Sequence, residues 1–382
     1  MNFALTDDQV MIRDAAASFL ADVCGSAAVR KAMESEAGFD AAVWQRIGAE
    51  LGWCGVAIDE AHGGMGLGSV ELVLIQEQAG RRLLCAPFYS TVCVGATLLQ
   101  ELAVESAQRK MLPQIAQGKL RTAVPTYGAI EEWVAEASHL HAKPQSKNSG
   151  KGWVLDGQLH YLMDGASADV LLVFAKLDQG GLGLFALPRG AKGVSVTPLT
   201  TWDQTRRFAD VAFAGVSEAE RIDDPDRVGD GVLRMASLAR LYLAAEQLGG
   251  AQHCLDMTVD YTTGRKQFGR PVAGFQAVKH RCAQMMVQVE ALRSAVYGAA
   301  ALAAGQPQTE TLALECAMAK ALASETLFFC AQEAIQLHGG VGFTWEYDPQ
   351  LYFKRAQASS HWLGTPEQLR ERMAQLLLDE AG

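Results

Sequence analysis

The sequence has no apolar run close to the roughly 18 residues that a membrane-spanning helix needs. Its opening residues, MNFALTDDQV, lack the basic and apolar segments of a secretory signal peptide. The eight cysteines are scattered, and no two of them form a CxxC pair, which argues against a zinc or redox centre. These absences predict a cytoplasmic protein outside the membrane, with reduced and mostly buried thiols and no metal site.

Positive charge is also scarce, because 33 Lys and Arg face 43 Asp and Glu, for a formal net charge of -10. Such an acidic balance argues against general binding to nucleic acid or to an anionic membrane surface. A local basic pocket for an anionic ligand stays compatible with it. Hydrophobic residues make up 49% of the 382 residues, so the chain can bury a large core.

Three regions of different character follow one another along the chain. Residues 1–120 carry apolar residues at helical spacing, and residues 229–382 contain long alanine-rich segments with few helix breakers. Residues 121–228 contain short β-prone runs broken by Asp-Gly pairs, which favour hairpin turns. We therefore predict an α+β fold with an N-terminal helical domain, a middle β domain and a C-terminal four-helix bundle.

Local signals place several of the expected helices. Thr6 with Gln9, and Thr365 with Gln368, have the spacing of capping boxes, so helices should begin directly after both threonines. In the N-terminal region the segments SVELVLIQEQAGRRLL and TVCVGATLLQELAV read as helices, and AHGGMGLGS as a loop. In the C-terminal region we expect helices over 231–267, 274–304 and 309–337, and after Pro366.

Two stretches combine residues that could hold an anionic ligand. GRKQFGRPVAGFQAVKH brings together Arg265, Lys266 and the flat ring of Phe268, although an exposed basic helix end would look the same. QLHGGVGFTWEY places Gln336 before two glycines that let a backbone approach a ligand closely, although an ordinary glycine helix stop would also look like this. The residues alone leave these alternatives open.

Taken together, the two stretches resemble hallmark segments of the acyl-CoA dehydrogenase flavoprotein family. The segments GWCGVAIDEAHGGMGLG, EQAGRRLLCAPF and TWDQTRRFADVAFAGV resemble that family as well, so the resemblance covers nearly the whole chain. It implies FAD as cofactor, an acyl-CoA substrate and an electron-transfer flavoprotein as electron acceptor. It also implies a tetramer, built as a pair of dimers, with FAD bound across each dimer interface.

The resemblance further implies which residues bind what. The cofactor-binding candidates, several of which serve a neighbouring subunit's FAD, are Arg265, Phe268, Gln276, Gln336, Gly339, Gly340 and Thr365. The candidates for substrate contact are Arg240 and Trp362.

The chain lacks the carboxylate that the family's chemistry uses most often. In many members, a Glu in an aromatic-Glu-Gly-Thr motif removes the α-proton of the acyl-CoA while the flavin accepts the β-hydride. The matching motif here is Trp362-Leu363-Gly364-Thr365, and a leucine side chain cannot accept a proton. The backbone N–H of Leu363 could still donate to a thioester carbonyl.

Some relatives place this base on the first long helix of the C-terminal domain, where this chain has Ala239. Glu246 lies seven residues further on, on the same helix face, and is the catalytic candidate that remains. The alternative interpretation is a structural glutamate that pairs with an arginine across the bundle, such as Arg240 or Arg281.

A second departure concerns the flavin-holding Thr-Glu-Pro…Gly-Ser-Asp stretch of the family. Here the region reads TAVPTYGAIEEWVAEASH, in which Tyr127 and Gly128 could fill part of it. The chain thus keeps the residues it would lend to a neighbour and lacks several it would use itself. This pattern resembles the α2β2 acyl-CoA dehydrogenases of steroid side-chain degradation, and it predicts a subunit that completes FAD sites with a related partner chain.

Three alternatives stay open on the sequence. The chain could form a self-sufficient homotetramer with Glu246 as base. It could instead be a non-catalytic structural subunit without flavin, or a flavin oxygenase or oxidase of the same fold.

Overall fold

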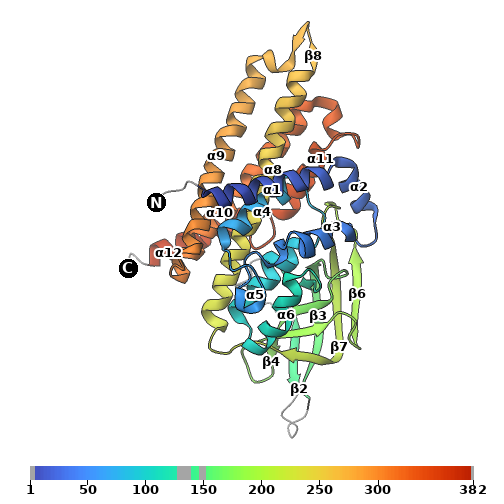
Figure 1. Ribbon diagram of the computed structural model, residues 1–382, viewed down its shortest axis with the longest axis vertical. Helices are drawn as coiled ribbons and strands as arrows, with labels where there is room; N and C mark the ends of the chain where they lie inside the picture. Colours follow the sequence, from blue (N-terminus) through green and yellow to red (C-terminus); the bar gives the residue numbers. More distant parts are fainter. Residues whose placement is uncertain (1–4, 127–138, 146–151, 380–382) are drawn as a thin grey trace.

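The computed structural model describes residues 5–126, 139–145 and 152–379 (Figure 1). Helices fill the first region, strands the second, and long helices the third, with one small hairpin among them. The predicted α+β order of helices, strands and helices is therefore confirmed. Within the described residues, we find no helix with the length and apolar character needed to cross a membrane.

The N-terminal helices surround an apolar interior. The first begins at the predicted capping box, where Thr6 Oγ1 accepts from Gln9 N and Gln9 Oε1 accepts from Thr6 N. The two helices predicted further on are also present, whereas several short helices between and after them were not predicted. The elements are α1 (Asp7–Val23), α2 (Ser26–Glu34), α3 (Ala41–Gln45), η1 (Arg46–Glu50), η2 (Trp53–Gly55), η3 (Glu60–His62), α4 (Ser69–Arg81), η4 (Tyr89–Ala96), α5 (Thr97–Leu102) and α6 (Glu105–Ala116).

The described strands of the middle region form one sheet that closes on itself. The strands are β1 (Thr122–Ala123), β2 (Leu140–Pro144), β3 (Trp153–Met163), β4 (Val170–Leu177), β5 (Leu182–Pro188), β6 (Val194–Leu199) and β7 (Phe208–Arg221). They pair in the order β1-β4-β2-β3-β7-β5, and β5 pairs back onto β4, so five strands form a closed circuit with its own apolar core. Strand β6 pairs with β7 outside this circuit.

The Asp-Gly pairs predicted as hairpin turns behave differently. Asp156 and Gly157 lie inside β3, where the pairing with β7 shifts register, so the prediction of a turn there is wrong. A Cβ at Gly157 would lie 2.1 Å from the carbonyl oxygen of His139, so the glycine permits close strand contact at an irregularity. Asp164 and Gly165 do form a turn, but it joins β3 to β4, which are separated in the sheet by β2.

The C-terminal helices pack around α10, which contacts each of the others. They are α8 (Val228–Gly264), α9 (Gln276–Ala304), α10 (Thr309–His338), α11 (Pro349–Ser359) and α12 (Pro366–Asp379). The predicted long helices match α8, α9, α10 and α12 to within three residues, whereas α11 was not predicted. Two glycines let α4 and α8 touch, because a Cβ at Gly80 or Gly249 would lie within 2 Å of a carbonyl oxygen of the other helix.

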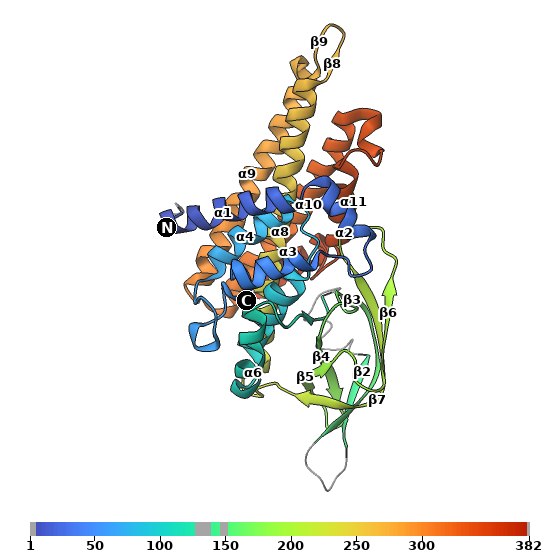
Figure 2. The same cartoon turned by 45° about the vertical axis from the view of Figure 1, so that its right-hand side comes forward.

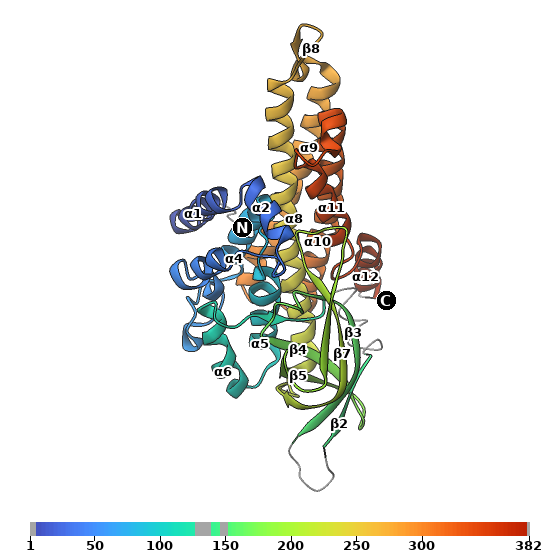
Figure 3. The ribbon, with the colours of Figure 1, turned by 90° about the vertical axis from the view of Figure 1, so that its right-hand side faces the viewer.

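The ends of α8 and α9 extend beyond the rest of the molecule and carry a small hairpin at their tip (Figures 2 and 3). Its strands are β8 (Lys266–Gln267) and β9 (Arg270–Pro271), followed by the short helix η5 (Val272–Gly274). We call α8 from Val259 onward, the hairpin and α9 up to Val287 the arm. A second short helix, η6 (Gly339–Phe343), directly follows α10.

Candidate functional site

The turn before α12, where the family's base is expected, is buried and closed by hydrogen bonds. Leu363 has no exposed surface and adopts the left-handed backbone conformation, with φ of 60°. Its N–H donates to the carbonyl of Thr126 (3.0 Å), and its carbonyl accepts from Arg240 Nε (3.0 Å). The expectation that this N–H serves a thioester carbonyl is therefore wrong for this structure, because Thr126 already accepts it.

A buried lysine stabilises the same turn from below. Lys320 Nζ on α10 donates to Ser324 Oγ (2.8 Å) and to the carbonyls of Ser359, Ser360 and Gly364 (3.2–3.3 Å). Its side chain is fully buried, and the acceptors are all neutral. Burial, with a smaller effect from the Arg240 charge, lowers the pKa of Lys320 to about 7. The carbonyls of Ser359 and Ser360 belong to the C-terminal end of α11, which is the negative end of its dipole.

Thr365 and Trp362 also have structural roles in this turn. Thr365 caps α12, since its Oγ1 accepts from Gln368 N (3.3 Å) and Gln368 Oε1 accepts from Thr365 N (2.9 Å). The Trp362 ring is buried against Phe208, with ring centroids 5.6 Å apart. The edge of Trp362 also lines a pocket of about 310 Å³ between the β region and α11, together with Tyr161 and Trp202. Aromatic walls of this kind suit a flat ligand.

Glu246 lies in a buried chain of charged side chains rather than in an open cleft. Its Oε2 accepts from Arg206 Nη2 (2.5 Å) and from Gln76 Nε2 (2.6 Å), and its Oε1 accepts from Arg355 Nη1 (2.5 Å). Arg355 Nε in turn donates to Asp203 Oδ2 (2.8 Å). We call Asp203, Arg355, Glu246 and Arg206 the charge quartet; each is at most 4% exposed.

The contacts within the quartet identify the ion-pair partners of Glu246. The partners are Arg206 and Arg355, so the prediction of Arg240 or Arg281 is wrong. Arg240 binds the Leu363 turn, and Arg281 pairs with Glu333 on α10 (3.6 Å). Burial alone would lower the pKa of Arg355, but Asp203 and Glu246 together raise it above its ordinary value. The guanidinium is thus fixed in its charged form.

The sequence-predicted residues of the arm are all exposed. Arg265 ends α8, Gln276 begins α9, and Phe268 lies at the hairpin tip with 90% of its surface exposed. Phe268 has a φ of 52°, which turns the chain sharply between β8 and β9. The arm therefore exposes a cation and an aromatic ring to solvent, and the Phe268 ring meets its own chain at Phe275, edge to face.

Gln336, Gly339 and Gly340 lie where α10 ends and η6 begins. Gln336 lines a groove of about 470 Å³ between α9 and α10, together with Arg281 and Glu333. Gly339 ends α10 with φ of 67°, and a Cβ at either glycine would meet no atom within 4 Å. The backbone there is thus open to a close approach from outside. The structure brings Gln336 and the start of α9 together, and keeps both apart from the Leu363 turn.

The remaining expectations concern the flavin-holding stretch, the cysteines and possible metal ligands. Tyr127 and Gly128, proposed to fill part of the flavin-holding stretch, lie outside the described residues. All eight cysteines are free, and seven of them are buried, as predicted. In the described part of the chain, no group of three or more His, Cys, Asp or Glu side chains could hold a metal ion.

Comparison with known proteins assigns the family. The acyl-CoA dehydrogenase N-terminal domain model matches residues 6–119, and the C-terminal domain model matches residues 231–378. The chain belongs to the acyl-CoA dehydrogenase family. The resemblance seen in the sequence is thereby confirmed, as is FAD as the cofactor that the family uses.

Several relatives match over almost their whole length. Acyl-CoA dehydrogenase IpdE2 of Mycobacterium tuberculosis is 34% identical over 368 residues, which are 96% of each chain. Among solved structures, a variant of the steroid ACAD Tcur3481-Tcur3483 is 28% identical with a TM-score of 0.87, covering 98% of this chain and 99% of that one. The ChsE4-ChsE5 complex from M. tuberculosis is 26% identical with a TM-score of 0.87, covering 99% of each.

Sequence reasoning missed most of the buried polar residues. Asp203 and Arg206 lie in TWDQTRRFADV, which served only as evidence of resemblance, and Arg355 lies in LYFKRA. Lys320 offered the clearest signal, because it is a single cation in the alanine-rich run CAMAKALAS. An isolated charge of this kind on an apolar helix predicts a buried polar contact, although it does not identify the partner.

We expect Glu246→Gln to destabilise the protein by about 3–5 kcal/mol, because it removes the carboxylate that bonds directly to both Arg206 and Arg355 in the buried interior. Urea unfolding followed by circular dichroism measures the change. Glu325→Gln is the matched control, since Glu325 pairs with Arg370 at the surface and should cost at most about 1 kcal/mol. Equal effects of the two substitutions would contradict the structural role of the quartet.

We expect the free energy of unfolding of the parent, minus that of Lys320→Met, to rise with pH between about 7 and 10. In this window the unfolded chain holds the lysine proton and the folded chain has released it, so Lys320 alone contributes an increase of up to about 1.4 kcal/mol per pH unit to the parent. Below pH 7 both states are protonated and the slope vanishes. Lys119→Met, which removes an exposed lysine, should leave the pH profile unchanged; superimposable profiles for Lys320→Met and the parent would disprove the assignment.

Proposed function

We propose that this chain is a subunit of an FAD-dependent acyl-CoA dehydrogenase that completes FAD sites with a related partner chain. The single observation behind the proposal is the Leu363 turn. The position from which the family's base usually acts holds a hydrocarbon side chain with no exposed surface. Abstraction of an α-proton requires a proton acceptor in contact with the substrate, and this turn has none to offer.

Glu246 does not supply the missing base in this proposal. Both of its carboxylate oxygens accept hydrogen bonds from buried cations, so the carboxylate is held within the quartet rather than facing a cleft. It also lies seven residues from Ala239, which is about 10 Å along an α-helix. The contacts of Glu246 in the quartet and its distance from position 239 both favour a structural role for this residue. They argue against a self-sufficient homotetramer that uses Glu246 as base.

The exposed residues of the arm support the proposal that this chain completes FAD sites with a partner chain. Arg265 offers a guanidinium that can bind a diphosphate in two-pronged fashion, and Phe268 offers a ring face for a flat base. Gln336, at the groove between α9 and α10, offers an amide to the same ligand. When bound, FAD would supply the hydride acceptor for α,β-dehydrogenation. The residues present on the arm fit its diphosphate and adenine end.

The relatives make a two-chain enzyme a reasonable expectation. Two of the solved structures are described as a two-component steroid ACAD and as the ChsE4-ChsE5 complex. We therefore propose a heteromeric enzyme whose substrate is an acyl-CoA of a steroid-derived or similarly bulky acid, with an electron-transfer flavoprotein as acceptor. A homotetramer, a flavin-free structural subunit, and a flavin oxygenase or oxidase are the alternatives.

Co-expression with a related acyl-CoA dehydrogenase chain from the same genome tests the proposal directly. We expect an α2β2 complex with two FAD per four chains, reduced by acyl-CoA under anaerobic conditions, and little FAD on this chain alone. Size-exclusion chromatography with light scattering and flavin absorbance measure these quantities. A homotetramer of this chain with four tightly bound FAD would refute the shared-site proposal. A complex without flavin would favour the structural subunit, and flavin that acyl-CoA cannot reduce would favour an oxygenase or oxidase.

We expect Phe268→Ala to lower the FAD content of that complex several-fold without changing the stability of this chain. The ring is almost fully exposed in the chain itself, so its loss should not disturb the fold. Met11→Ala on α1 is the matched control, because Met11 is also an exposed apolar residue, 65% exposed, but lies outside the arm. If both variants retain full FAD, the assignment of Phe268 to the partner's cofactor is wrong.

A further inference from the structure

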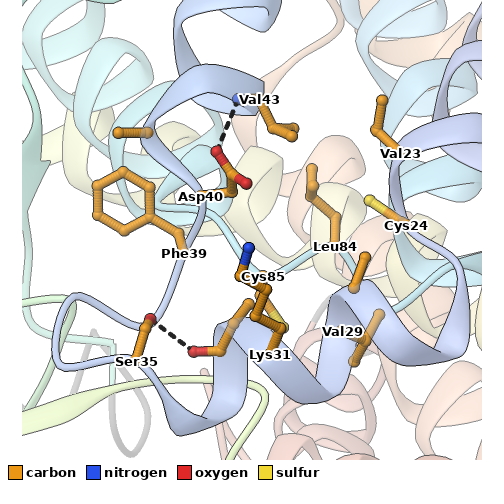
Figure 4. A pocket seen from close by; sticks show the side chains of 13 residues that line it. Val23, Cys24, Val29, Lys31, Ser35, Phe39, Asp40, Val43, Leu84 and Cys85 are labelled. Atoms are coloured by element: carbon orange, nitrogen blue, oxygen red, sulfur yellow. Dashed lines mark hydrogen bonds between the residues drawn. The ribbon is translucent and has the colours of Figure 1, made fainter.

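A largely apolar pocket that is partly open to solvent lies in the N-terminal helices, apart from the Leu363 turn and the arm. It has a volume of about 370 Å³ and lies between the end of α1, the inner side of α2, the start of α3 and the segment before η4 (Figure 4). This volume is in the range of small-molecule sites in proteins. The family chemistry proposed above uses none of its residues.

The walls of the pocket are hydrocarbon. Side chains of Val23, Val29, Val43, Phe39 and Leu84 surround the space, and small alanine residues between them leave it open (Figure 4). Such a surface favours an apolar occupant, because each methylene moved from water onto it contributes about 0.8 kcal/mol.

Two thiols, Cys24 and Cys85, add no charge to the interior. Burial raises the pKa of Cys24 to about 12 and the pKa of Cys85 to about 11. Both thiols therefore stay protonated near neutral pH, which makes them weak nucleophiles and poor metal ligands. The pocket is thus suited to reversible binding of an uncharged, apolar group.

The rim of the pocket carries a positive charge. Lys31 is exposed on α2, and among the described residues no carboxylate lies within ion-pair distance of it. The nearby Asp40 is engaged otherwise, since its Oδ1 accepts the N–H groups of Ala42 and Val43 and caps α3. Ser35 donates its hydroxyl to the carbonyl of Ala32. The entrance thus carries the ammonium of Lys31, which has no ion-pair partner among the described residues, and the carboxylate of Asp40, which caps α3.

We propose that this pocket binds a small apolar carboxylate, such as a medium-chain fatty acid. The hydrocarbon part occupies the space between α2, α3 and Leu84, and the carboxylate lies at the rim near Lys31. The Leu84 carbonyl also accepts from Arg206 of the charge quartet (3.3 Å), so an occupant would pack against a segment that the quartet holds.

Isothermal titration of the purified chain with sodium octanoate, nonanoate and decanoate tests this proposal. We expect affinity to increase about fourfold for each added methylene. Decanol, which lacks the carboxylate, should bind about two- to fivefold more weakly than decanoate, and Lys31→Met should weaken decanoate binding to the level of decanol. Lys119→Met is the matched control, because this exposed lysine lies outside the pocket, and it should bind decanoate as the parent does.

Two variants on α2 locate the site. Ala28 lines the pocket and is exposed at its mouth, so Ala28→Trp should block binding at least tenfold without unfolding the chain. Ala27 is exposed on the same helix but does not line the pocket, so Ala27→Trp should bind normally. Decanoate should also slow labelling of Cys24 and Cys85 by N-ethylmaleimide while leaving Cys282 unaffected, as mass spectrometry can measure.

Three results would overturn the proposal. The first is no binding of decanoate at millimolar concentration. The second is equal affinity for decanoate and decanol, which would remove the carboxylate from the recognition. The third is normal decanoate binding by Ala28→Trp, which would place the ligand elsewhere on the chain.

Discussion

The charge quartet is the interaction on which the rest of the structure depends, because every part of the chain contributes to it. Asp203 and Arg206 come from the segment between β6 and β7, Glu246 from α8 and Arg355 from α11. The N-terminal helices contribute Gln76 and the main-chain carbonyls of Leu84 and Ala86, which accept from Arg206. Two positive and two negative side chains balance one another out of contact with water. A shift of any one part would leave a buried charge without its partner, at a cost of several kcal/mol.

The need to pair buried charges also bears on which residue could act as a catalytic base. A general base needs a free lone pair and room for the substrate beside it, whereas a buried carboxylate needs as many donors as it can reach. Glu246 satisfies the second requirement, because both of its oxygens accept hydrogen bonds from buried donors. The Leu363 turn shows a parallel closure, since Thr126, Arg240 and Lys320 bind the polar backbone groups of residues 363 and 364. Glu246 and the Leu363 turn are thus both held by hydrogen bonds within the fold.

Much of the fold followed from local patterns in the sequence, and the exceptions share a physical cause. Capping boxes at Thr6 and Thr365 act within four residues, so they could be predicted and are present. The partners of Glu246 lie 40 and 109 residues away along the chain, and no local pattern encodes such a meeting. Asp156-Gly157 failed as a hairpin signal because the glycine serves close strand packing instead. Candidate residues for ligand contact could be named from resemblance, but their exposure or burial depended on tertiary structure.

The exposure of the arm and its proposed role in contacting a partner chain are physically linked. A two-stranded hairpin is only marginally stable when it stands alone in water. This one carries Phe268 at its tip, and the adjoining part of α9 exposes Met286 and Val287. Apolar surface of this kind stabilises a protein only when a partner buries it, at roughly 25 cal/mol for each Å² removed from water. A chain that covers the arm would gain this apolar contact and the nearby Arg265 at the same time. Under the proposed function, association of the subunits and completion of a cofactor site would use this one contact surface.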